Sequence, residues 1–80
     1  MRKFRQKSVI VEATQIDSES FSYSQRIQGF FYNLRDLTIT FHTPNGMVKC
    51  RIGDWIVKGP DGGYTRCFAK PFLMAYEEVQ

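Results

Sequence analysis

The chain has 80 residues, a length that accommodates one small domain, and 15% of its side chains are aromatic. This composition is typical of a folded globular domain and argues against intrinsic disorder. Eleven Lys and Arg against eight Asp and Glu give a net charge of +3, which favours anionic ligands without requiring nucleic acid. No apolar run approaches the roughly 18 residues of a membrane span, and two cysteines allow one disulfide at most, so we expect a cytoplasmic protein with reduced thiols.

The first third of the chain predicts a basic tail, a strand and a helix. Residues 1–7 form a basic N-terminal segment, for which a solvated and partly frayed tail is favoured. Residues 8–16 alternate apolar and polar side chains and predict a strand with Val9, Val11 and Ala13 on one face. The segment from Asp17 to Ser20 offers N-caps, and the apolar residues after it recur at spacings near three and four, which predicts a short helix at about 19–33. Its buried stripe would comprise Phe21, Ile27, Phe31 and Leu34, with Phe30 alongside.

The rest of the chain predicts hairpins. The expected strands are residues 37–43, 47–52, 55–58, 64–67 and 75–79. Residues 44–46 and 59–63 are rich in Pro, Asn and Gly and predict the connecting turns, and a single helical turn is expected at 71–74. The apolar face of the first hairpin would comprise Leu37, Ile39, Phe41, Val48, Cys50 and Ile52. We therefore predict one α+β domain over residues 1–80, with an antiparallel sheet of five to six strands, open or barrel-like, packed on one short helix.

Three segments carry recognisable motifs. Residues 5–15 are a segment that begins with basic residues and ends in Glu-Ala-Thr-Gln, and residues 53–59 read Gly-Asp-Trp-Ile-Val-Lys-Gly. Residues 63–67 read Gly-Tyr-Thr-Arg-Cys and are followed nine residues on by Tyr76-Glu77. Together they resemble a family of small bacteriophage proteins of unassigned function, with the signature Gly-Asp-(Trp/Tyr)-Ile-(Ile/Val)-(Lys/Arg)-Gly.

The resemblance covers both ends of the chain and leaves residues 17–46 unmatched. The family usually has Pro before the Gly-Asp pair, where this chain has Ile52, and Lys-Pro directly after the Cys, where residues 68–69 intervene here. The Cys-to-Tyr spacing agrees with the family, which implies a shared fold. A phage origin implies a role in host takeover or counter-defence.

No catalytic constellation emerges from the sequence. His42 is the only histidine, and strand alternation places it on the face opposite Cys50, which argues against a Cys-His pair. The spacing of these residues and Cys67 also lacks the pattern of a zinc site. Cys50 is expected to be buried; for Cys67 burial is favoured, with a thiol activated by nearby cations as the alternative. We therefore expect no enzyme, no cofactor and no metal.

The favoured functional hypothesis is a binding module for a phosphate-bearing ligand, either a nucleotide signal or nucleic acid. Cations on strands would contact phosphates, and aromatic rings beside them would stack on bases. The candidate ligand-binding residues are Lys49, Arg51, Trp55, Lys58, Tyr64 and Arg66. For Trp55 a place in the core is the favoured interpretation, whereas for Tyr64 the core and the ligand site are evenly balanced.

The alternative hypothesis is a protein–protein inhibitor of a host defence enzyme. Consecutive residues diverge by about 100° around a helix, so the aromatic residues of the predicted helix cannot all face one core. The exposed candidates for a partner surface are Tyr23, Phe30 and Tyr32. Since the core is small and aromatic residues are in surplus, we also expect a homodimer.

Overall fold

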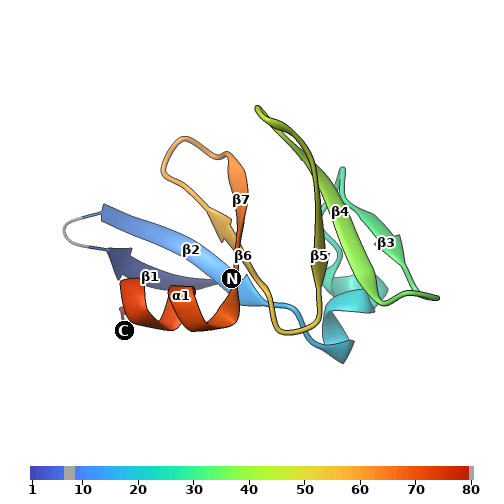
Figure 1. Cartoon of the computed structure of the whole chain (residues 1–80), viewed down its shortest axis with the longest axis horizontal. Helices are drawn as coiled ribbons and strands as arrows, with labels where there is room; N and C mark the ends of the chain where they lie inside the picture. The colour runs from blue at the N-terminus through green and yellow to red at the C-terminus, as the bar shows by residue number, and fades with distance from the viewer. Residues whose placement is uncertain (7–8, 80) are drawn as a thin grey trace.

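The computed structural model describes residues 1–6 and 9–79, so the parts of the predictions that concern Lys7 and Ser8 lie outside the described residues. The described chain forms two antiparallel sheets, of five and three strands, and one short α-helix (Figure 1). This confirms the predicted α+β class. The strands are divided between two sheets and do not close into a barrel within the described residues.

The five-stranded sheet has the order β7-β6-β2-β1-β8. Its strands are β1 (Arg2–Gln6), β2 (Val9–Gln15), β6 (Trp55–Lys58), β7 (Tyr64–Cys67) and β8 (Glu77–Glu78). The predicted strand near the N-terminus is confirmed as β2, in which Val11 and Ala13 are buried, but Val9 is 47% exposed. The predicted hairpin across the Gly-rich turn is confirmed by the pairing of Val57 with Thr65.

The prediction of a frayed basic tail is wrong for the described residues of the segment. Arg2–Gln6 is a strand that pairs with β2 on one side and β8 on the other. Its single apolar side chain, Phe4, is only 4% exposed, while Arg2 and Arg5 form ion pairs with the two glutamates of β8. One apolar residue among charges gives no periodic signal, so this strand depends on pairing with segments distant in the sequence.

The prediction of a helix at 19–33 is also wrong. The segment forms two short 3-10 turns, η1 (Ser18–Phe21) and η2 (Tyr23–Gln25), and then strand β3 (Phe31–Asn33). Asp17 does cap η1, accepting the backbone N–H groups of Glu19 and Ser20. Helical geometry is impossible at Gly29, whose φ is 88°. Two members of the expected buried stripe, Phe31 and Leu34, are 61% and 59% exposed because the chain reverses here rather than continuing as a helix.

The three-stranded sheet has the order β3-β4-β5, where β4 is Thr38–Thr43 and β5 is Gly46–Arg51. The predicted hairpin is confirmed: Ile39 lies opposite Cys50, and Phe41 lies opposite Val48. The predicted apolar face is wrong at its two ends, since Leu37 and Ile52 lie just outside the two strands and are exposed.

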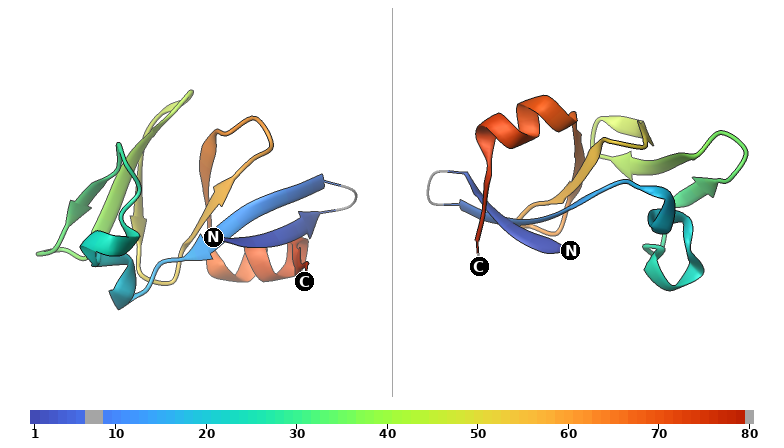
Figure 2. Two further views of the ribbon diagram at one scale, coloured as in Figure 1. Left: turned by 180° about the vertical axis from the view of Figure 1, so that it is seen from behind. Right: turned by 90° about the horizontal axis from the view of Figure 1, so that it is seen from below.

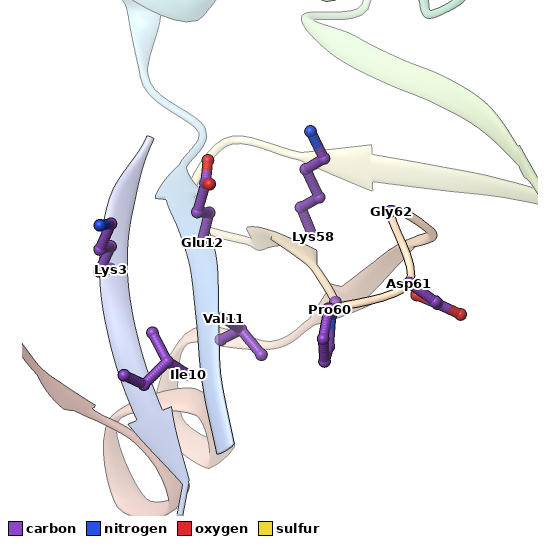
Figure 3. Close-up of a pocket in the computed structure, with 9 residues that line it drawn as sticks. Lys3, Ile10, Val11, Glu12, Lys58, Pro60, Asp61 and Gly62 are labelled. Carbon is purple, nitrogen blue, oxygen red and sulfur yellow. The ribbon is translucent and has the colours of Figure 1, made fainter.

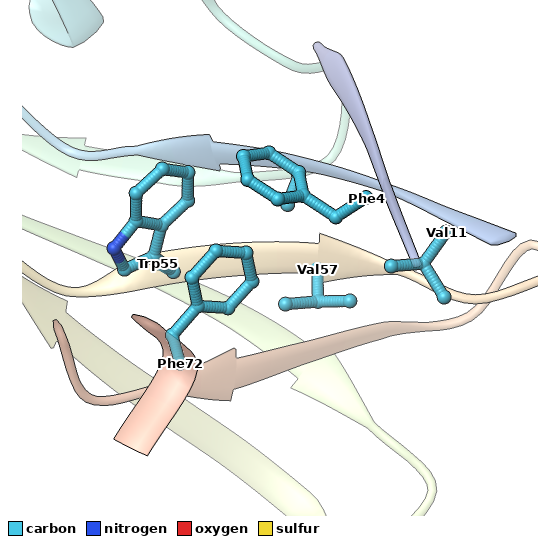
Figure 4. Packing of buried hydrophobic residues seen from close by; sticks show 6 residues of the cluster. Phe4, Val11, Trp55, Val57 and Phe72 are labelled. Carbon is cyan, nitrogen blue, oxygen red and sulfur yellow. The ribbon is translucent and has the colours of Figure 1, made fainter. Parts of the chain in front are cut away.

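The α-helix, α1, spans Ala69–Ala75, so the single turn expected at 71–74 extends in both directions. Phe72 is fully buried and stacks on Trp55 with ring centroids 4.1 Å apart, while Phe4 meets it edge-on (Figure 4). We call this group the helix-side cluster; it comprises Phe4, Val11, Ala13, Trp55, Val57 and Phe72. The helix therefore covers one face of the five-stranded sheet. No helix among the described residues is long and apolar enough to cross a membrane.

A second cluster joins the two sheets. This inter-sheet cluster comprises Ile16, Phe21, Ile39, Phe41, Cys50 and Ile56. Strand β6 contributes to both clusters, because Trp55 and Val57 face α1 and Ile56 between them faces the three-stranded sheet. The 3-10 turns lie on the side of the three-stranded sheet that faces this cluster (Figure 2). The edge of that sheet formed by β5 thus comes to lie beside β7.

Candidate anion-binding site

Three of the predicted ligand-binding cations come together where the two sheets meet. Lys49 and Arg51 alternate on β5 with the buried Cys50, so they point away from the inter-sheet cluster. Arg66 reaches across from β7 of the other sheet, and its Nη1 donates a hydrogen bond of 2.7 Å to the carbonyl oxygen of Lys49. This hydrogen bond ties a cation of one sheet to the open edge of the other.

These cations line a surface hollow of about 370 Å³, which we call the basic hollow. Its lining residues are Lys49, Arg51, Asp54, Arg66 and Phe68. Asp54 is the one carboxylate among them, and its Oδ2 accepts the backbone N–H of Arg51 at 3.0 Å. Among residues 1–6 and 9–79, ion pairs join only β1 to β8, so none of the three cations is neutralised by direct contact with a carboxylate. The hollow therefore carries a local excess of positive charge.

Phe68 adds an aromatic surface to the basic hollow. It precedes α1, is 55% exposed, and lies 4.6 Å (ring centroid) from the guanidinium carbon of Arg66. This cation–π contact orients the Arg66 side chain while leaving much of the ring open. Phe68 was not among the predicted ligand-binding residues, although its position two residues after Arg66 at the end of a strand would place both side chains on one side.

The other three predicted ligand-binding residues lie elsewhere. Trp55 is 3% exposed and belongs to the helix-side cluster, which confirms the core interpretation. Tyr64 is half-buried and packs edge-on against Phe30, with Lys58 paired opposite it on β6. Trp55 and Tyr64 therefore do not form a shared aromatic platform. Trp55 is paired with Cys67, and Tyr64 lies three positions before Cys67 on β7, so the side chains of Trp55 and Tyr64 point to opposite faces of the sheet.

Lys58 instead borders a second hollow, of about 440 Å³, on the exposed face of the five-stranded sheet (Figure 3). Lys3, Glu12 and Lys58 form a row across β1, β2 and β6, with the carboxylate in the middle. The turn at 59–62 forms the far wall. Because Glu12 lies between the two lysines, this hollow offers an anion less net positive charge than the basic hollow does.

The predicted aromatic partner surface is not formed. Phe30 is stacked on Phe41 with centroids 4.6 Å apart, and the hydroxyl of Tyr32 accepts the backbone N–H of Ile27 at 2.8 Å. Both side chains are half-buried against the inter-sheet cluster. Tyr23 alone of the three is well exposed, at 86%, and the Arg26 guanidinium lies against its ring. Without a helix in this segment, the three residues share no common face.

The thiols are held in their protonated form. Burial raises the pKa of Cys50 to about 11, and the charge of Asp54 adds to this effect. Burial and the charge of Asp54 also raise the pKa of Cys67, which disfavours the alternative of an activated thiol there. His42 is exposed on β4 opposite Met47, and the described residues contain no group of three His, Cys, Asp or Glu that could hold a metal ion.

Comparisons of the chain with protein-family models, with curated proteins and with solved structures find no match. The resemblance to small phage proteins accordingly stays a prediction.

Proposed function

We propose that this protein binds a phosphate-bearing ligand, a nucleotide or nucleic acid, at the basic hollow. The supporting observation is the convergence of Lys49, Arg51 and Arg66 from two sheets on one concave surface, where none of them is paired to a carboxylate in the described part of the chain. Unpaired cations repel one another, and a bound polyanion relieves this repulsion. A purely structural role would favour acidic partners for them.

The chemistry of the lining residues suits a phosphate. Guanidinium groups present several N–H donors in a plane and bind phosphate oxygens in pairs, while a lysine ammonium adds a compact charge. The exposed ring of Phe68 lies beside Arg66, where a base attached to the phosphate could stack. We propose binding without catalysis, because the thiols of Cys50 and Cys67 are poor nucleophiles in this environment.

In combination with the resemblance to phage proteins, sequestration of a nucleotide signal or of nucleic acid would serve counter-defence. The alternative of an inhibitor acting through an aromatic helix face loses its support, since Phe30 and Tyr32 pack against the core.

Titration calorimetry with inorganic pyrophosphate and with ATP tests this proposal. We expect Arg51→Gln and Arg66→Gln each to weaken binding by about tenfold or more, because a charge-assisted hydrogen bond contributes about 1.5–3 kcal/mol. Lys58→Gln is the matched control: it removes the same charge from the other hollow and should change affinity little. Thermal unfolding of each variant establishes that it is folded. Absence of binding by the wild type, or equal effects of all three variants, would contradict a site at the basic hollow.

A further inference from the structure

Resting on the proposed function, we infer that the ligand is single-stranded nucleic acid, and that it extends from the basic hollow onto the open face of the three-stranded sheet. One side of this sheet contacts the inter-sheet cluster and the 3-10 turns. No described element lies over the other side, which we call the outer face (Figures 1 and 2). The strand positions that point to it are Phe31, Asn33, Thr40, His42, Met47, Lys49 and Arg51, together with Thr38, which is only 4% exposed.

Phe31 is an aromatic residue that the outer face leaves exposed to solvent. It is 61% exposed and belongs to neither core cluster, although its neighbour Tyr32 packs inward. Its cross-strand partner is Thr40, whose partner on the next strand is Lys49. Since neighbouring strands are about 4.8 Å apart, the backbones of Phe31 and Lys49 are about 10 Å apart on the same face. An exposed ring thus lies within nucleotide reach of a cation.

The charge of the outer face selects a polyanion. Its eight strand positions include Lys49 and Arg51 but no Asp or Glu. An acidic protein would match the charge as well, but it would not account for the two exposed aromatic rings beside the cations, Phe31 on the outer face and Phe68 in the basic hollow. Phosphates bind the cations, and bases stack on aromatic rings whatever their sequence.

The outer face and the basic hollow are continuous. Lys49 and Arg51 belong to both, so the cations lie between Phe31 on one side and Phe68 on the other. A mononucleotide has one base and could occupy only one of the two rings. A strand of several nucleotides could use both rings, whereas in a duplex the bases already stack on one another and are not available. The arrangement therefore points to an unpaired strand.

Fluorescence anisotropy with labelled DNA and RNA strands of about 12 nucleotides, a length within the range of known single-strand sites, tests this inference. We expect the single strands to bind at least tenfold more tightly than a duplex of the same length. Phe31→Ala should weaken strand binding by about 5-fold or more, given roughly 1–3 kcal/mol for each stacked base, and leave pyrophosphate binding unchanged. Tyr23→Ala is the matched control, since it removes an even more exposed ring from outside the outer face.

The outcomes separate the two proposals. If pyrophosphate binds and Arg66→Gln abolishes that binding, but strands bind no better than duplexes or Phe31→Ala has no effect, the inference is overturned and the basic hollow stands. If neither strands nor pyrophosphate bind, both proposals fail. The affinities of the DNA and RNA strands, compared with each other, show which of the two nucleic acids the protein prefers. Lys49→Gln should lower the slope of log affinity against log salt by about 0.7, as expected for one phosphate contact on a single strand.

Discussion

At the scale of single residues, Leu37 has an unfavourable backbone conformation. Within the described residues it is the only one other than glycine with a positive φ, 54°. It closes the β3–β4 turn, which Asn33 organises by accepting the backbone N–H groups of Arg35 and Asp36. A left-handed conformation costs an L-amino acid with a Cβ roughly 1–2 kcal/mol. The Leu37 side chain is 43% exposed, so its partial burial offsets only part of this cost.

We therefore predict that Leu37→Gly changes the free energy of unfolding by less than about 1 kcal/mol, because glycine adopts positive φ without steric cost and this relief offsets its greater chain entropy and the lost contacts of the leucine side chain. Urea denaturation followed by circular dichroism measures the change. Leu34→Gly is the control: it lies in the same turn and is exposed, but its φ is not positive. Glycine there should lower stability through chain entropy. Equal effects of the two substitutions would contradict the conformational explanation.

At the scale of elements, α1 depends on its docking. It has seven residues and no side-chain cap on its first turn, and isolated helices of this length are unstable in water. Phe72 anchors it: the ring lies against Trp55 on one side and within 4.7 Å (centroids) of Tyr76. The neighbouring Leu73 and Met74 face away and are 66% and 82% exposed. Thus one side chain provides most of the burial that keeps the helix in place.

We predict that Phe72→Ala lowers the free energy of unfolding by about 3–5 kcal/mol, the usual cost of truncating a buried Phe. Leu73→Ala, on the exposed side of the same helix, should change it by less than about 0.5 kcal/mol. Urea titration monitored by Trp55 fluorescence suits this comparison, because Trp55 contacts Phe72 directly. A small loss for Phe72→Ala would mean that the helix is not anchored as described.

At the scale of the whole molecule, the two sheets are joined through strand β6. Ile56 points from the five-stranded sheet into the inter-sheet cluster and is 2% exposed. The hydrogen bonds of Ile16 with Asp54 and Gly53 hold the adjoining chain segments together at 2.8 and 2.9 Å. The basic hollow spans this junction, so its geometry requires that both sheets keep their relative positions.

We predict that the two sheets unfold as one unit. Trp55 fluorescence reports on the helix-side cluster, and the reactivity of the buried Cys50 thiol reports on the inter-sheet cluster. In the wild type the two urea transitions should coincide. Ile56→Ala should shift both together, with a loss of about 2–5 kcal/mol typical of a buried isoleucine. Val9→Ala, at an exposed strand position, should shift neither appreciably. Separate transitions in the wild type would show that the sheets are independent.

Most of the strands in the second half of the chain could be predicted from the sequence, because their signals are local. Alternation over 38–43 and 46–51, with Pro44 and Asn45 between them and Gly46 at the start of the second strand, specifies a hairpin and its register. The same alternation places Lys49 and Arg51 on the face of the strand that points away from the side chain of Cys50. The helix predicted at 19–33 was wrong because apolar residues at spacings near three and four are typical of a helix. In the structure these residues belong to 3-10 turns, a loop and a strand.

The sequence by itself determined the α+β class, the hairpins and the outward direction of the cations on β5, since period-two patterning and turn residues act within a few positions. Only the tertiary structure decided that Arg2–Gln6 is a strand, that Trp55 faces α1, and that Arg66 and Phe68 join Lys49 at the basic hollow. These features depend on contacts between segments distant in the chain. Such contacts form where burial and pairing are most favourable overall, and no local pattern records them.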